Sequence, residues 1–227
     1  MLDCRLTLRQ LDVIWDDLGL GIHPYPLTIP YHGATRSARQ RLRDDVRAEL
    51  RRTGHVDRRN RLEPDLEAAL RMLARPERSV DSVWLDAAAP DRARRTLAVR
   101  TGRRAVLAIQ RPHPTGSLED ANPNGITIRD IHIKALAEHT IATMPTALGR
   151  TEITDPPTGI GAPTSTTWTA VGVLGVHTPD HTGDDSPRQE VRWILRAGTC
   201  EAIGPPNQRG RLLIHLNSLI AYPSEHA

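Results

Sequence analysis

The stretch TLAVRTGRRAVLAI, residues 96–109, decides the fold class of this chain. Two largely apolar runs, 96–100 and 105–109, flank the polar tetrad Thr101–Arg104, which contains Gly102. Apolar runs on either side of a short glycine-containing turn are typical of a β-hairpin. We therefore predict two antiparallel strands here. The expected partners across the hairpin are Val106, Leu107 and Ile109 on one strand and Leu97 and Val99 on the other.

Outward from this hairpin, apolar and polar residues alternate in several further segments, and this alternation predicts more strands. These strands are residues 79–85, 126–133, 169–176, 190–196 and 211–216. The segments 111–125 and 155–167 are rich in Pro, Gly, Ser, Thr or Asn, so they are expected to be loops.

The N-terminal part of the chain predicts helices instead. Thr7 and Gln10 have the spacing of a capping box, and Gly19 stands where the first helix should end. A second helix is expected over residues 35–53, a third begins at Pro64, and a short fourth covers 134–144. Between the first two helices, the proline-rich segment 21–33 is expected to be extended, with three residues packed along the core. Those residues are Tyr25, Leu27 and Ile29.

Three helices followed by several strands, one helix and more strands are typical of an α+β fold, in which helices and strands are segregated. We expect a mainly antiparallel, twisted sheet with flanking helices. The 227 residues are expected to form a single domain. It would comprise an N-terminal half (1–145), a crossing segment (146–167) and a strand-rich C-terminal half (168–227).

The charge balance argues against a nucleic-acid binder. The chain has 30 Lys and Arg against 27 Asp and Glu, a net charge of +3, and the two signs are interleaved. Nucleic-acid binding requires positive charge gathered on one face. The second helix keeps this alternative open, because it is rich in arginine. Acidic residues interrupt the basic run, however, so a solvated helix with exposed ion pairs is the favoured interpretation.

The sequence also predicts a cytoplasmic location. No apolar run reaches the roughly 18 to 20 residues that a membrane-spanning helix needs, so no membrane insertion is expected. Met1–Cys4 lacks the basic and apolar regions of a signal peptide. Cys4 and Cys200 are interpreted as two free thiols in a reducing compartment, with a disulfide as the alternative.

Catalytic motifs are missing from the sequence. It contains no phosphate-binding glycine loop, no HExxH metal motif and no GxSxG nucleophile elbow, so we assign no catalytic residue and no cofactor. The best metal candidate is the segment His177–Asp185, whose two imidazoles and three carboxylates could ligate zinc: His177, Asp180, His181, Asp184 and Asp185. Pro, Gly and Asp are also the residues of a hairpin loop, and that interpretation is favoured. A metal-dependent enzyme remains the alternative.

Several short segments share their order and spacing with one protein family. They are Leu6–Gly21, His23–Leu27, His32–Thr35, Leu73–Glu77 and Arg104–Ala108. Together they resemble the EspG family of actinobacteria over about residues 5–140. The second half departs from the family pattern, because the tract 155–167 leads directly to strands and the sequence indicates no closing helix.

The resemblance implies a cytosolic chaperone of type VII (ESX) secretion. Such a protein binds the helical tip of a PE/PPE-type or WXG100-related substrate pair and keeps it soluble for export. The resemblance further implies a sheet with pseudo-twofold halves, a monomer or weak dimer, and no catalytic residues or cofactor. A divergent EspG-like protein that binds another partner is the alternative.

Family members carry a variable substrate-contacting hairpin loop, and the charged segment Asp86–Arg95 occupies the corresponding place here. We expect this segment to be a loop that joins two strands. The residues assigned to partner contact are Asp86, Asp91, Arg92, Arg94 and Arg95.

Overall fold

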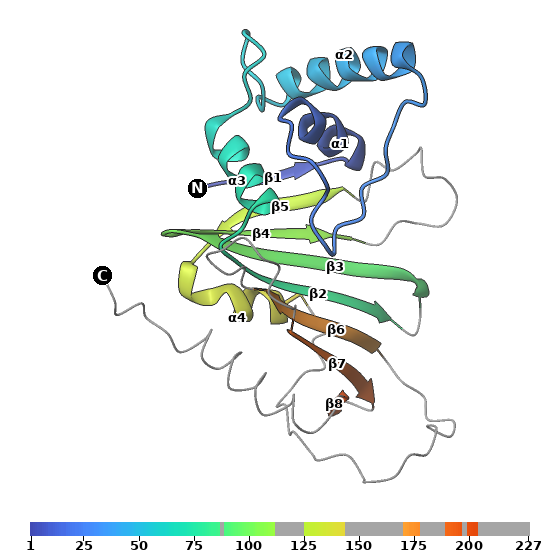
Figure 1. Ribbon diagram of the computed structural model, residues 1–227, viewed down its shortest axis with the longest axis vertical. Coiled ribbons are helices and arrows are strands. Elements are labelled where there is room, and N and C mark those ends of the chain that lie inside the picture. The colour runs from blue at the N-terminus through green and yellow to red at the C-terminus, as the bar shows by residue number, and fades with distance from the viewer. Residues whose placement is uncertain (87–88, 112–124, 144–169, 178–188, 197–198, 204–227) are drawn as a thin grey trace.

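In the computed structural model the chain forms one eight-stranded sheet, whose strands follow the order β1-β5-β4-β3-β2-β6-β7-β8 (Figure 1). The structure describes residues 1–86, 89–111, 125–143, 170–177, 189–196 and 199–203. Every neighbouring pair of strands is antiparallel. Strands from the C-terminal part therefore continue the sheet that the N-terminal part begins. The predicted α+β class with a mainly antiparallel sheet is confirmed.

The strands are β1 (Asp3–Leu6), β2 (Arg78–Asp86), β3 (Ala89–Thr101), β4 (Arg104–Gln110), β5 (Ile126–Ile131), β6 (Ala170–His177), β7 (Gln189–Arg196) and β8 (Thr199–Ile203). The hairpin predicted at 96–109 is confirmed as β3 and β4, with Leu97 opposite Ala108 and Val99 opposite Val106. Gly102 in its turn has a φ of +56°, a conformation that glycine adopts without steric cost. The predicted strand 211–216 lies outside the described residues.

The helices are α1 (Leu8–Asp17), α2 (Arg36–Arg52), α3 (Pro64–Ala74) and α4 (Leu136–Ile141), and a 3₁₀ turn, η1 (Ile133–Ala135), precedes α4. The capping box is confirmed. The Thr7 hydroxyl accepts from the Gln10 backbone N–H, and the Gln10 side chain accepts from the Thr7 N–H, both at 3.0 Å. This pair satisfies two of the N–H groups that a helix start leaves without partners.

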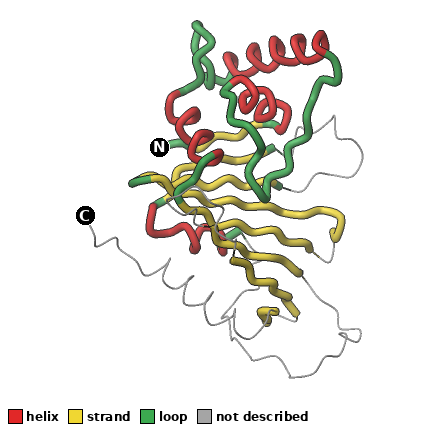
Figure 2. The backbone as a smooth tube through the Cα atoms, in the orientation of Figure 1, coloured by secondary structure: helices red, strands yellow, loops and turns green. Residues whose placement is uncertain are grey.

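Helices pack against the sheet (Figure 2), and strand alternation divides the apolar residues between its two faces. On the first face, α1 and α3 cover Leu97, Val99, Val106, Ala108, Ile126 and Ile128. On the second face, Leu136 of α4 packs into a smaller cluster with Val80, Trp84, Ala98, Ala105, Leu107, Leu174 and Val176. The sheet is therefore the shared wall of two cores.

Cys4 lies in β1, where its side chain faces the first core and is 6% exposed. It is a free thiol, and burial raises its pKa to about 12. A thiol with such a pKa stays protonated at neutral pH, and only the thiolate is nucleophilic. Cys4 therefore serves as a small apolar residue in the core.

Candidate partner-binding surface

The segment predicted as a contact loop is mostly strand. β2 extends to Asp86 and β3 begins at Ala89, and the two residues are paired across the hairpin. The prediction of a loop over 86–95 is therefore wrong. The first half of β3 carries several charged residues, which hid its strand character in the sequence. Asp86 is paired with Ala89, whereas Asp91 and Arg92 lie in β3 where the register shifts between the Asp86–Ala89 and Trp84–Arg94 pairs. The side chains of all three lie outside the described residues.

Arg94 is held against an aromatic ring on the neighbouring strand. Arg94 and Trp84 are directly opposite each other in the β2–β3 pairing, so their side chains share one face of the sheet. The guanidinium carbon of Arg94 lies 4.8 Å from the centroid of the Trp84 ring. Trp84 is only 3% exposed, whereas Arg94 is exposed. A cation–π contact of this kind orients the arginine while its charge stays available at the surface.

Arg95 points to the opposite, first face of the sheet. It is half-buried, and its Nη1 donates a hydrogen bond to the Ala93 carbonyl at 3.2 Å. Burial lowers the pKa of Arg95, and the neighbouring Tyr25 opposes this shift. We call Arg94 and Arg95 the hairpin root, because β3 leaves its pairing with β4 at this point. The hairpin root thus presents one arginine on each face of the sheet. The structure does not bring Arg94 and Arg95 together into one basic patch.

Residues 21–33, which we call the tyrosine loop, cross the first face beside Arg95 (Figure 1). Gln110 pins this loop to β4. Its side-chain oxygen accepts from the Thr28 N–H at 2.9 Å, and its side-chain nitrogen donates to the Thr28 carbonyl at 2.6 Å. Leu27 is buried as predicted, and Ile29 packs against the core. The prediction that Tyr25 packs along the core is wrong, because its side chain is 56% exposed.

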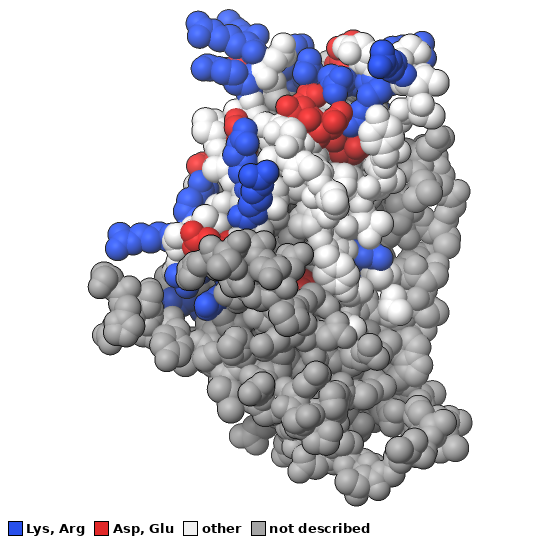
Figure 3. Space-filling model, in the orientation of Figure 1, with Lys and Arg blue, Asp and Glu red and all other residues white. Residues whose placement is uncertain are grey.

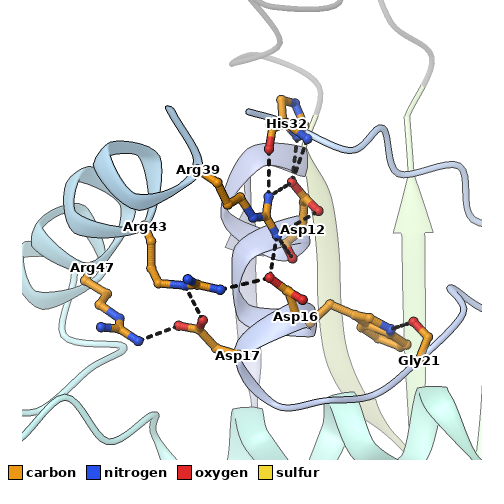
Figure 4. Close-up of polar contacts among 9 residues, drawn as sticks. Asp12, Asp16, Asp17, Gly21, His32, Arg39, Arg43 and Arg47 are labelled. Carbon is orange, nitrogen blue, oxygen red and sulfur yellow. Dashed lines mark hydrogen bonds and ion pairs between the residues drawn. The ribbon is translucent and has the colours of Figure 1, made fainter. Parts of the chain in front are cut away.

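The arginines on the inner side of α2 are neutralised by acidic residues of α1 (Figure 4). Arg39 Nη1 contacts Asp12 at 2.5 Å, and Arg39 Nη2 contacts Asp16 at 3.1 Å. Arg43 and Arg47 pair with Asp16 and Asp17 in the same way, at distances of 2.6 to 2.9 Å. Figure 3 shows the acidic atoms enclosed by basic ones in this region. The arginine-rich helix therefore serves largely as an interhelical clamp.

Asp12 is the centre of this clamp and is almost completely buried. Its side chain is 3% exposed and that of Arg39 is 6% exposed. The same carboxylate also accepts from the His32 backbone N–H at 2.9 Å and contacts His32 Nδ1 at 3.0 Å. Asp12 thereby joins α1, α2 and the end of the tyrosine loop. The sequence predicted exposed ion pairs on α2 and missed this buried one.

A groove of about 690 Å³ lies between α1, α3 and the turn that joins α2 to α3. Its apolar lining includes Val13, Ile14, Leu18, Leu50, Val56 and Leu62. Its charged lining includes Asp17, Arg47, Asp57 and Arg61, which form two ion pairs at 2.8 Å. Glu63 and Glu67 also line the groove, so its lining holds more carboxylates than arginines.

The metal candidate lies almost entirely outside the described residues, since only His177, at the end of β6, is described. Among the residues that the structure does describe, no three His, Cys, Asp or Glu side chains are grouped so as to hold a metal ion. Among the helices that the structure describes, none is long and apolar enough to cross a membrane.

The surroundings of His23, in the tyrosine loop, lead us to expect that folding stability depends on pH. Its ring centroid lies 5.3 Å from that of Trp15, and its Nε2 atom is buried without a hydrogen-bond partner among the described residues. Burial lowers its pKa, and the charge of Asp12 opposes this shift. Because the folded state holds the proton less tightly than the unfolded state, folding stability is full above the unfolded pKa of about 6.5 and falls as the pH drops below it.

We therefore expect the thermal midpoint of the chain to fall between about pH 7.5 and about pH 5.5. In the His23→Gln variant, which lacks the titrating ring, this fall should be smaller. Thermal unfolding followed by circular dichroism at several pH values measures the difference. Equal slopes for the two proteins would contradict the assignment to His23.

The sequence and the fold of this chain were each found to be similar to known proteins. A model described as the EspG family matches residues 7–149, which is more than half of the chain. The fold is similar to the solved structure of the Mycobacterium tuberculosis type VII secretion system chaperone EspG5 in complex with the PE25-PPE41 dimer. The TM-score is 0.62 at 11% sequence identity, and the similarity covers 100% of this chain and 99% of that chain. No curated protein gave a match. The fold likeness thus continues beyond residue 149, where the family match ends.

Proposed function

Because the chain belongs to the EspG family, we propose that it is a cytoplasmic chaperone of type VII secretion. It binds a helical secretion substrate of the PE/PPE type, or a WXG100-related one, and keeps that substrate soluble until export. The observation that carries this proposal is the family match over residues 7–149. The fold shared with EspG5, which was solved in complex with PE25-PPE41, supports it. Binding of this kind covers apolar surface and needs no catalytic residue.

The β2–β3 hairpin is the proposed contact element, with Asp86, Asp91, Arg92, Arg94 and Arg95 as its contact residues. Arg94 supports this assignment, because its guanidinium is exposed and already oriented by the Trp84 ring. An arginine that is fixed before binding loses less side-chain entropy when a partner arrives. Arginine is also among the residues that most often dominate binding energy at interfaces.

Co-expression with a PE/PPE-type pair from the native host tests the proposed function. The chain should elute with the pair as a soluble complex of one copy of each protein, and the pair should precipitate without it. Size-exclusion chromatography with light scattering measures both results. If each candidate pair from that host remains unbound, the proposed chaperone function is wrong.

Charge reversal at the hairpin root tests the contact element. The variant Arg94→Glu should weaken substrate binding by about tenfold or more, because it reverses the exposed positive charge of the contact surface. Arg103→Glu is the matched control, since Arg103 is an exposed arginine in the turn at the far end of β3. Titration calorimetry measures both affinities. An equal loss in the two proteins would assign the effect to net charge and contradict the hairpin contact.

A further inference from the structure

The tyrosine loop displays an unusual share of the exposed apolar surface. Ile22, Tyr25 and Tyr31 are 92%, 56% and 70% exposed. Among the described residues, Met1 is the one other large hydrophobic residue that is comparably exposed. Single exposed apolar residues are normal on a protein surface, but three within ten residues of one loop indicate a contact surface.

The loop backbone is fixed, so this exposure does not arise from an unanchored segment. Near its start, the Gly21 carbonyl accepts a hydrogen bond from Trp15 Nε1 at 3.0 Å. In its middle, the backbone N–H and C=O of Thr28 both form hydrogen bonds with the side-chain amide of Gln110. Near its end, the His32 N–H is bound by Asp12. A display that is rigid before binding avoids much of the entropy cost of ordering an interface.

The two tyrosines are supported from beneath by the fold. The guanidinium carbon of Arg39 lies 4.5 Å from the centroid of the Tyr31 ring, and Arg39 itself is held by Asp12 and Asp16. Tyr25 is a neighbour of Arg95 on the first face of the sheet. Tyrosine supplies a large amphipathic contact area with few rotatable bonds, which suits it to protein interfaces.

The loop is continuous with the root of the β2–β3 hairpin. In the β3–β4 pairing Arg95 lies directly opposite Gln110, and Gln110 is the residue that binds Thr28 of the loop. Tyr25, Thr28 and Arg95 therefore meet at one end of the first face. A partner that contacts the hairpin root on this face reaches the tyrosine loop without crossing another element.

We propose that the tyrosine loop extends the partner surface of the β2–β3 hairpin and takes apolar side chains of the same helical partner. This inference rests on the proposed function. An amphipathic helix binds through apolar side chains spaced along one of its faces, and Ile22, Tyr25 and Tyr31 offer apolar groups along the loop. The polar hydroxyls of the tyrosines and the charge of Arg95 suit the edges of such a helix.

The triple variant Ile22→Ala, Tyr25→Ala, Tyr31→Ala tests this inference with the PE/PPE-type pair that the unchanged chain binds. Its affinity should fall by about tenfold or more, as expected for the loss of aromatic anchors. The matched control is Tyr25→Phe, Tyr31→Phe, which keeps both rings and should bind within about threefold of the unchanged chain. The pair Ile22→Ala and Tyr25→Ala leaves the Arg39–Tyr31 contact intact, so it serves as a second test if the triple variant unfolds.

The outcomes separate the inference from the proposed function. If the unchanged chain binds its substrate and the alanine variants bind it equally well, the inference is overturned and the proposed function stands. If the free chain forms a dimer that the triple variant loses, and substrate binding is unaffected, the loop joins two copies of this chain and the inference is wrong. If the unchanged chain binds no helical substrate, the inference falls together with the proposed function.

Discussion

Replacing Asp12 with alanine should lower the free energy of unfolding by about 3 to 5 kcal/mol, the range found when one partner of a buried ion pair is removed. The variant leaves the buried guanidinium of Arg39 with Asp16 as its remaining carboxylate, and the Asp16 side chain is 48% exposed. It also removes the acceptor of the His32 N–H. A loss of this size corresponds to a fall of about 10 °C in the thermal midpoint for a chain of this length. Urea unfolding followed by circular dichroism measures it.

The exposed pair on α3 provides the matched control. Glu67 and Arg71 are four residues apart, and their side chains are 37% and 54% exposed. Arg71 Nη2 lies 2.8 Å from Glu67 Oε1. Replacing Glu67 with alanine should cost about 0.5 kcal/mol, because water screens an exposed pair. If the two substitutions have similar effects, the clamp between α1 and α2 is not a buried interaction. A selective loss at Asp12 would confirm that this carboxylate joins the two helices to the tyrosine loop.

The sequence predicted those elements whose signals are local. The hairpin of β3 and β4 could be predicted because two largely apolar runs flank a short glycine-containing turn. The start of α1 was readable because a capping box needs two residue types at one spacing. β1 was missed, because it has only four residues and forms by pairing with β5, which lies far along the chain at Ile126–Ile131. Strand pairing of that kind leaves no local mark in a short segment.

The contacts of the candidate site were harder to predict from the sequence, because they join distant parts of the chain. A helical pattern shows that α2 has many arginines, but it does not show that Arg39 reaches Asp12 on another helix. Long charged side chains bury their stems and choose partners through tertiary packing. The alternation of Tyr25, Leu27 and Ile29 suggested three buried residues. The Gln110 amide fixes the loop so that Tyr25 faces solvent.

Replacing Trp84 with alanine should lower the free energy of unfolding by about 3 to 5 kcal/mol, as expected for a large buried aromatic. Trp84 is 3% exposed and belongs to the smaller core on the second face. Its neighbours there include Ala98, and the residue opposite it on β6 is Gly172. Such small residues cannot fill the space that the indole leaves, so the cavity should persist. Guanidinium unfolding should show the loss as a lower midpoint, with loosening of the β2–β6 pairing visible by hydrogen exchange.

The conservative variant Trp84→Phe separates packing from the role of the ring beneath Arg94. It keeps most of the buried volume and should cost about 1 kcal/mol. A phenyl ring attracts a guanidinium less strongly than an indole does, so Arg94 should be held less firmly. If the oriented Arg94 contributes to partner binding, Trp84→Phe should weaken substrate affinity while the fold stays intact. Unchanged affinity together with a small loss of stability would show that the Trp84 ring serves the core alone.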